Sequence, residues 1–284
     1  MTRARGFSQI DVFGQAPMLG NPLAVVLDAS DLSDDQMRNF ARWTNLSETT
    51  FLLPPTSVDA DYRVRIFTPA TELPFAGHPT LGSCHAWLEA GGKPASSEFI
   101  VQQCGIGLVR LRRHPPRLAF AAPALRQEAI EPGLLAQVCA ALGVQAQHVR
   151  ATCLLDNGPK WLSLLLADPQ TVLALQPDHA RLKDLGYKVG VAAPYPASAG
   201  ARGPHLEVRA FAAPAGVPED PVTGSLNASL AQWLIASGQM PSRYIASQGA
   251  CLDRAGRVHI EEDPMGQVWV GGEAVTCIRG SVTL

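Results

Sequence analysis

Short apolar runs and alternating apolar and polar positions dominate the chain and predict a protein built mainly of strands. Residues 62–67 (YRVRIF) alternate, whereas residues 23–27 (LAVVL) form an uninterrupted apolar run, and both patterns are typical of strands. A Gly-Asn-Pro turn at residues 20–22 precedes the apolar run. The other predicted strands lie at residues 8–13, 49–53, 161–166, 188–192 and 205–211.

A helical period is present in only a few segments. Ser33 and Gln36 have the spacing of a capping box, in which each side chain accepts a hydrogen bond from the backbone of the other residue. Met37 and Phe40 follow at helical spacing, so a helix is predicted over about residues 34–44. Further helices are predicted after Pro79, near residues 132–142 and after Ser225.

The order of these elements argues against two large enzyme classes. Strands and helices do not alternate regularly as in βαβ units, and neither G-x-G-x-x-G at a strand-to-helix turn nor G-x-x-x-x-G-K-[ST] is present. A Rossmann site for nicotinamide or flavin and a P-loop nucleotide site are therefore not expected. The pattern predicts the α+β class.

A block of the form R-x-F, a short loop and E-x-P-x-x-G-[HS] occurs twice, about half a chain apart. The first copy spans residues 65–78 and the second spans residues 209–225. Each is followed by a helix-like segment that ends at a glycine, Gly91 or Gly238, as expected just past a helix C-terminus. The repeat predicts two related halves that share one site.

Each repeated block opens a helix, and helix starts of this kind suit an anion. Glycine lets backbone N–H groups approach a ligand closely, and the N-terminus of a helix carries partial positive charge. His78 or Thr80 is expected to cap the first helix, and Thr223 or Ser225 the second. A single junction of this type is usually only a turn, but two copies that carry acidic residues favour a carboxylate-binding site.

Several polar side chains near these blocks are candidates for acid–base chemistry. Glu48 precedes an apolar strand, so it is either a surface acid or a carboxylate at the edge of the core that acts as a general acid or base. Glu219 matches Glu72 in the repeat and is assigned a structural task in the turn. Asp220, which has no acidic counterpart in the first half, and His78, beside the repeated glycine, are the better chemical candidates.

The composition excludes several classes of function but does not indicate a particular one. Hydrophobic residues make up 46% of the 284 residues and the net charge is −2, so no basic surface for nucleic acid is expected. The basic cluster at residues 110–117 is interpreted as a solvated strand end, and no apolar run is long enough to span a membrane. The six cysteines are scattered without a C-x-x-C pair, which predicts reduced thiols in the cytoplasm and no zinc site. His78 and His85 can share a helix face, but two histidines are weak evidence for a metal.

Five blocks in chain order carry a family resemblance. They are residues 11–13 (DVF), 20–26 (GNPLAVV), 45–51 (NLSETTF), 67–82 (FTPATELPFAGHPTLG) and 219–225 (EDPVTGS). Together they resemble the phenazine-biosynthesis PhzF-like family. The resemblance implies a diaminopimelate-epimerase-like fold of two pseudo-symmetric α+β halves, each a curled, mostly antiparallel sheet around a central helix, with the active site between them. The halves are expected at residues 1–115 and 116–284, with the last strand able to pack back on the first half.

The resemblance also implies roles for particular residues. Relatives that epimerise or racemise amino acids carry a cysteine at each helix start, where this chain has His78 and Ser225, so a two-thiol racemase is disfavoured. Glu48 is implied as the single acid/base, with His78 and Asp220 orienting groups or relaying protons. The residues implied to hold the substrate are Asn21, Gly77, Gly224 and Ser225.

The sequence thus predicts a cytoplasmic isomerase that needs no cofactor or metal and relocates a proton in a small metabolite. That metabolite bears a carboxylate and is expected to be cyclic and amino-acid-like. A homodimer is implied by the resemblance, and neither nucleic acid nor a membrane is an expected partner. Two alternatives stay open: an epimerase or racemase with non-thiol bases, and a small-molecule-binding protein that has lost turnover.

Overall fold

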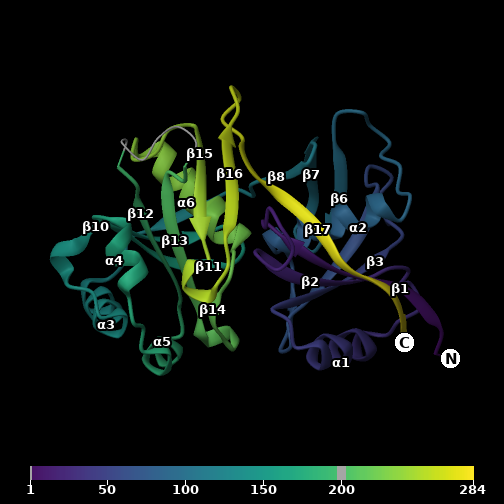
Figure 1. The fold of residues 1–284 in the computed structure, drawn as a ribbon, viewed down its shortest axis with the longest axis horizontal. Coiled ribbons are helices and arrows are strands. Elements are labelled where there is room, and N and C mark those ends of the chain that lie inside the picture. Colours follow the sequence, from purple (N-terminus) through teal and green to yellow (C-terminus); the bar gives the residue numbers. More distant parts are fainter. Residues whose placement is uncertain (1, 197–202) are drawn as a thin grey trace. The chain divides into compact units, whose positions relative to one another are not determined.

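The computed structural model describes residues 2–196 and 203–284. The chain divides into two compact units, each of mixed strands and helices (Figure 1). Unit 1 consists of Met1–Ala121 together with Gly271–Leu284, and unit 2 consists of Ala122–Val270. The C-terminal segment therefore belongs to the same unit as the N-terminal segment.

Unit 1 extends beyond the boundary expected at residue 115. Strands β7 (Gly107–His114) and β8 (Arg117–Ala121) form an antiparallel hairpin in which His114 pairs with Arg117. Pro115 and Pro116 are thus the turn of this hairpin. The basic cluster lies on the same hairpin, in agreement with its interpretation as a strand end.

Unit 1 contains more strand than helix. The remaining strands are β1 (Ala4–Val12), β2 (Asn21–Val26), β3 (Glu48–Leu53), β4 (Tyr62–Phe67), β5 (Glu72–Leu73), β6 (Ile100–Cys104) and β17 (Val268–Thr283), and the helices are α1 (Asp34–Thr44) and α2 (Gly77–Glu89).

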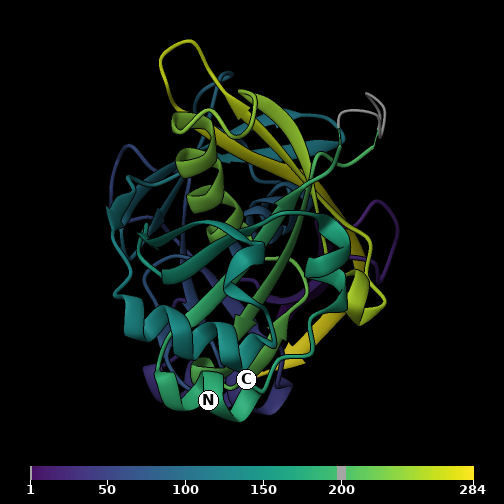
Figure 2. The ribbon, with the colours of Figure 1, turned by 90° about the vertical axis from the view of Figure 1, so that its left-hand side faces the viewer.

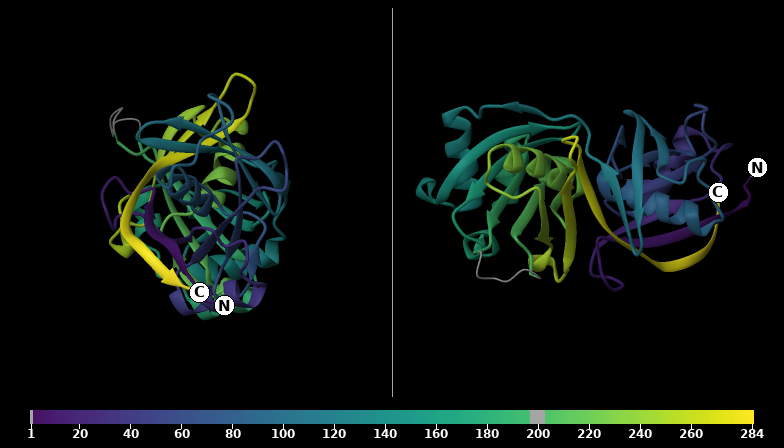
Figure 3. Two further views of the ribbon diagram at one scale, coloured as in Figure 1. Left: turned by 90° about the vertical axis from the view of Figure 1, so that its right-hand side faces the viewer. Right: turned by 90° about the horizontal axis from the view of Figure 1, so that it is seen from above.

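The strands of unit 1 pair in a ring that returns to its first member. Pairing proceeds from β1 through β2, β3, β4, β6, β7 and β8 to β17, and β17 pairs with β1 in turn. The pairs β2–β3 and β4–β6 are parallel. Figure 3 shows β17 beside β1, and the backbone N–H of Arg3 donates to the carbonyl of Leu284 over 2.8 Å.

Helix α2 is surrounded by the strands of this ring. It contacts β1, β2, β3 and β8, and its first eight residues are all buried. A helix that is buried on every side shows little amphipathic period, as α2 does. Gly82 has a packing role, because a Cβ there would lie 2.6 Å from the Cδ2 atom of Leu23.

Helix α1 confirms the predicted capping box and its predicted bounds. The Ser33 side chain accepts from the Gln36 backbone, and the Gln36 side chain accepts from the Ser33 backbone. The apolar side of α1 packs on strands β3 and β4. Phe51 and Phe67 meet Phe40 there in a buried aromatic cluster, which anchors α1 to the sheet.

Unit 2 alternates strands with short helices. Its strands are β9 (Arg126–Glu128), β10 (Val149–Asp156), β11 (Lys160–Leu166), β12 (Lys188–Pro194), β13 (Leu206–Ala212), β14 (Val217–Asp220), β15 (Arg243–Gln248) and β16 (Gly256–Glu262). Its helices are α3 (Pro132–Leu142), α4 (Pro169–Ala174), α5 (His179–Leu185) and α6 (Gly224–Ala236), with 3-10 turns at Ala146–His148, Ala213–Ala215 and Ala250–Leu252.

The two units use the same order of strand pairings. From β1 to β7, leaving out β5, successive pairs are antiparallel, parallel, antiparallel, parallel and antiparallel. The pairs from β10 to β16, leaving out β14, follow the same order. In each unit a short strand, β5 or β14, pairs with the preceding long strand just before the helix α2 or α6.

The predicted helix over residues 132–142 is confirmed as α3, which lies over the strands of unit 2 with α4 and α5 (Figure 2). Leu142, Val172 and Leu182 from these helices share a buried cluster with the sheet. Helices α4 and α5 were missed because each has fewer than two turns, too few for a periodic pattern. Within the described part of the chain, no helix is long and apolar enough to cross a membrane.

Candidate functional site

The start of α2 has no side-chain cap, so the expectation that His78 or Thr80 caps it is wrong. The N-cap residue is Ala76, and the Thr80 hydroxyl instead donates to the Ala76 carbonyl over 2.9 Å. The first N–H groups of a helix have no partner inside it. With no side-chain cap at α2, the N–H groups of Gly77 and His78 remain suited to an anion.

Three predicted site residues of unit 1 meet at this helix start. Asn21 begins β2 and Glu48 begins β3, and these two strands are parallel, so their first residues lie at one edge. The Asn21 amide nitrogen lies 3.3 Å from His78 Nδ1, and His78 Nε2 lies 3.4 Å from Glu48 Oε2. The imidazole is thus placed between an amide and a carboxylate.

Hydrogen bonding decides which nitrogen of His78 carries the proton. The Ser47 hydroxyl donates to Asn21 Oδ1 over 3.2 Å, which leaves the amide N–H groups of Asn21 to donate toward His78. Nδ1 of His78 is therefore the acceptor, and Nε2 carries the proton that faces Glu48. A separation of 3.4 Å is long for a hydrogen bond, but such contacts in active sites often shorten when substrate binds.

Burial keeps the His78 ring neutral. Only 3% of the residue is exposed, and burial lowers its pKa from the usual 6.5 to about 3. Desolvation disfavours the charged imidazolium. At neutral pH the ring is therefore neutral, and its Nε2 faces the Glu48 carboxylate at 3.4 Å as a potential hydrogen-bond donor and not as a cation paired with it.

The lowered pKa of His78 predicts a pH dependence of stability. Between about pH 6.5 and 3 the unfolded chain binds a proton at this histidine and the folded chain does not, so the free energy of unfolding decreases as pH falls. The loss approaches about 1.4 kcal/mol per pH unit within that window. Urea unfolding of wild type and His78→Gln at pH 7, 6, 5 and 4 measures it. The wild-type curve should fall more steeply, and parallel curves would contradict the assignment.

The start of α6 in unit 2 also lacks a side-chain cap, so the capping predicted for Thr223 or Ser225 is wrong. Thr223 is the N-cap residue, but its hydroxyl donates to Asp220 Oδ2 over 2.6 Å. Gln248 braces this turn, since its amide donates to the Thr223 hydroxyl and the Asp220 carbonyl and accepts from the Thr223 N–H. Asp220 is thereby fixed beside the helix start that Gly224 opens.

Ser225, the second residue of α6, is held by two side chains from the β10–β11 hairpin. The Trp161 indole N–H donates to Ser225 Oγ over 3.2 Å, and the Asn157 amide donates to the Ser225 carbonyl over 3.0 Å. Both donors are almost completely buried. Ser225 therefore has a fixed environment at the position that His78 occupies in α2.

The repeated arginine and glutamate share a structural task in the two units, as expected for Glu72 and Glu219. Arg65 donates to both carboxylate oxygens of Glu72 at 2.7 Å each, and Arg209 donates to those of Glu219 at 2.9 and 2.8 Å. The arginines lie over Phe67 and Phe211, each 5.0 Å from the ring centroid. These bidentate pairs tie the long strand to the turn that leads into the helix.

The structure thus groups the predicted residues into two sets. Asn21, Glu48, Gly77 and His78 lie together in unit 1, whereas Asp220, Gly224 and Ser225 lie together in unit 2.

Sequence reasoning missed Trp161, Asn157 and Gln248. A signal for the first two exists, because an Asn-Gly-Pro turn at residues 157–159 precedes β11 much as Gly-Asn-Pro at residues 20–22 accompanies the start of β2.

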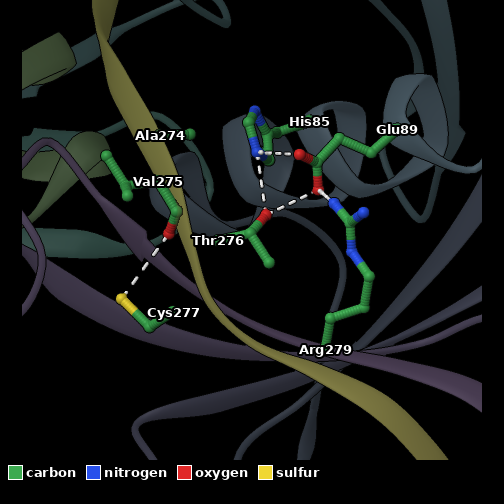
Figure 4. A pocket seen from close by; sticks show the side chains of 7 residues that line it. All are labelled: His85, Glu89, Ala274, Val275, Thr276, Cys277 and Arg279. Atoms are coloured by element: carbon green, nitrogen blue, oxygen red, sulfur yellow. Dashed lines mark hydrogen bonds and ion pairs between the residues drawn. The ribbon is translucent and has the colours of Figure 1, made fainter.

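His85 belongs to a different environment from His78. An open pocket of about 530 Å³ in unit 1 is lined by His85, Glu89, residues 274–277 and Arg279, and none of the predicted catalytic residues lines it. Figure 4 shows His85 and Glu89 directed at Thr276, whose hydroxyl lies 3.0 Å from His85 Nε2 and donates to Glu89 over 2.6 Å. Among the described residues, no three His, Cys, Asp or Glu side chains form a metal-binding group.

Comparison with known proteins gives the class, which is that of an isomerase. The chain is 34% identical to trans-2,3-dihydro-3-hydroxyanthranilate isomerase of Pseudomonas aeruginosa, over 97% of this chain and 98% of that protein. The profile of the phenazine biosynthesis-like protein family, PhzC-PhzF, matches residues 10–280. The chain belongs to this family.

Two other similarities extend the comparison. The chain is 37% identical to antisense-enhancing sequence 1 of Schizosaccharomyces pombe, over 96% of this chain and 97% of that protein. The crystal structure of a PhzF-family phenazine biosynthesis protein from Bacillus anthracis matches with a TM-score of 0.84 at 20% identity, covering 99% of this chain and all of that one. The second similarity concerns the fold alone.

Proposed function

We propose that this isomerase acts without a cofactor or metal and relocates a proton within a small, cyclic, amino-acid-like carboxylate. The Pseudomonas aeruginosa relative supports the substrate class, because its name specifies a ring that carries an amino group and a carboxylate. The observation that carries the proposal is the contact between Glu48 Oε2 and a neutral, buried His78 over 3.4 Å.

In the proposed reaction Glu48 acts first as base and then as acid. Its carboxylate accepts a proton from one substrate carbon while the conjugated double bonds shift, exchanges that proton with solvent, and delivers a proton to another position of the same substrate. No proton or electron is gained or lost overall. His78 Nε2–H orients the carboxylate, and Asn21 keeps the imidazole in the tautomer that this requires.

The two helix starts are proposed as anion-binding sites of their units. The backbone N–H groups at Gly77 and Gly224, which no side chain caps, would bind a carboxylate and stabilise negative charge that develops on a substrate. Ser225 would donate a further hydrogen bond, and Asp220 would relay a proton or orient the amino group. The shared order of strand pairings supports our inference that the two units are related halves.

The direct test is conversion of trans-2,3-dihydro-3-hydroxyanthranilate in D₂O, followed by NMR, together with a panel of small cyclic amino acids and carboxylates. We expect isomerisation of at least one member with incorporation of one solvent deuteron, at least about 10³-fold faster than without enzyme. Inversion of a stereocentre without isomerisation would instead favour an epimerase or racemase. Binding without exchange or conversion would favour a binding protein, and either result contradicts the proposal.

Two accompanying expectations are also proposals. All six cysteines are unpaired thiols, which supports a reducing compartment such as the cytoplasm. A homodimer is proposed from family membership, and light scattering of the purified protein would decide it.

A further inference from the structure

The hydrogen bond from Trp161 restricts what the Ser225 hydroxyl can do. An indole nitrogen is a donor only, so in this 3.2 Å contact Ser225 Oγ must be the acceptor. Among the described residues, no protein acceptor receives a hydrogen bond from the Ser225 hydroxyl. The O–H proton is therefore left for a group that the protein itself does not supply.

The second residue of α2, His78, also accepts a hydrogen bond from a neighbouring side chain. His78 accepts a hydrogen bond on Nδ1 from Asn21 and thereby presents its remaining N–H as a donor. In both units a side chain from a neighbouring strand donates a hydrogen bond to the side-chain acceptor of the second helical residue: Asn21 donates to His78 in α2, and Trp161 donates to Ser225 in α6. The common consequence is a fixed donor at each helix start.

A cation lies over the ring of Trp161. The Lys188 ammonium is 5.5 Å from the ring centroid. Trp161 and Lys188 lie opposite each other in the parallel pair β11–β12, as Leu23 and Glu48 do in the parallel pair β2–β3 of unit 1. A cation over an aromatic face draws electron density from the ring. This strengthens the indole N–H as a donor to Ser225, and Trp161 itself is only 2% exposed, which keeps water from competing.

We propose that Trp161 is a positioning residue that turns the Ser225 O–H toward the substrate carboxylate. This inference rests on the proposed function and deepens it, because it assigns carboxylate recognition in unit 2 to a Trp161–Ser225 pair. Trp161 does not touch the substrate, and its effect passes through the serine hydroxyl alone.

The test is calorimetric binding of 3-hydroxyanthranilate, an aromatic relative of the proposed substrate, to the full chain. Trp161→Phe removes the indole N–H and keeps a large aromatic ring, and we expect about a tenfold weaker affinity, the effect of one hydrogen bond to a charged group. Trp269→Phe is the matched control, because its buried indole N–H also donates within unit 2, to Asp263 over 2.9 Å. The control should bind as wild type does.

Two further measurements separate positioning from loss of structure. In a Ser225→Ala background, Trp161→Phe should cause no further loss, since the hydroxyl through which it acts is gone. Binding of 2-aminophenol, which lacks the carboxylate, should be the same in wild type and Trp161→Phe. With a turned-over substrate, KM should rise while kcat stays within about twofold.

Wild-type affinity in Trp161→Phe, or an equal loss with and without Ser225, would overturn the inference. Failure of the proposed function is distinguishable from this result. If coupling between Trp161 and Ser225 persists but no substrate undergoes proton exchange, the isomerase proposal fails and the positioning role stands. If wild type does not bind 3-hydroxyanthranilate, the proposed substrate class and the inference fail together.

Discussion

Glu48→Gln is expected to lower the rate of isomerisation and of solvent deuterium exchange by about 10³-fold, within the range of general acid–base catalysis. The amide has nearly the same shape as the carboxylate but cannot accept the substrate proton at neutral pH. Affinity for a carboxylate ligand should stay within about threefold of wild type, because the helix starts proposed to bind the carboxylate are unchanged. Exchange measured by NMR and binding measured by calorimetry check the two parts separately.

A matched substitution on the same unit serves as the control. Glu72→Gln also removes a carboxylate charge from unit 1, but Glu72 pairs with Arg65 and not with His78. This variant should keep its activity. Undiminished deuterium exchange in Glu48→Gln would remove Glu48 from the mechanism, and an equal loss in both variants would indicate a general effect of charge.

The second large effect is on stability. Arg209→Met is expected to lower the free energy of unfolding by about 3–5 kcal/mol, because it leaves the Glu219 carboxylate buried without its partner. The side chains of both residues are only 7% exposed. Arg209 also donates to the carbonyls of Val172 and Leu175 at the end of α4, and these contacts would be lost as well.

The equivalent arginine of unit 1 provides the comparison. Arg65→Met should cost only about 1 kcal/mol, because its partners Glu72 and Asp34 are 40% and 66% exposed and water can replace the guanidinium. Urea unfolding of both variants measures the difference. The double variant Arg209→Met with Glu219→Leu should recover part of the loss, since it removes the buried charge. Equal losses at Arg209 and Arg65 would contradict this account.

Local features of the fold could be predicted from the sequence. The capping box at Ser33 and Gln36 involves contacts within a single turn, and the repeat predicted a shared structural task for Glu72 and Glu219, whose arginine partners lie 7 and 10 residues away along the chain. The predicted boundary at residue 115 differs from that of the compact units, because Pro115 and Pro116 form the turn of the β7–β8 hairpin and both strands of this hairpin belong to unit 1.

Only the residue types of the candidate site could be predicted from the sequence, and the contacts between these residues could not. His78 contacts Asn21 from 57 residues away, and Ser225 contacts Trp161 from 64 residues away, distances over which periodicity carries no information. The capping expectations failed for a related reason. Thr223 and His78 bond to side chains that the tertiary structure brings to them, and these bonds replace the local caps that the sequence pattern suggests.

The closed ring of unit 1 sets an order of events during synthesis. Strand β17 completes that ring by pairing with β1 and β8, yet residues 271–283 of this strand follow the whole of unit 2 in the chain. A ribosome therefore releases every strand of β9 to β16 before it supplies the strand that unit 1 needs. The open edge of the unit that carries Glu48 and His78 must therefore stay free of other chains until residues 274–283, which pair with β1, have been translated.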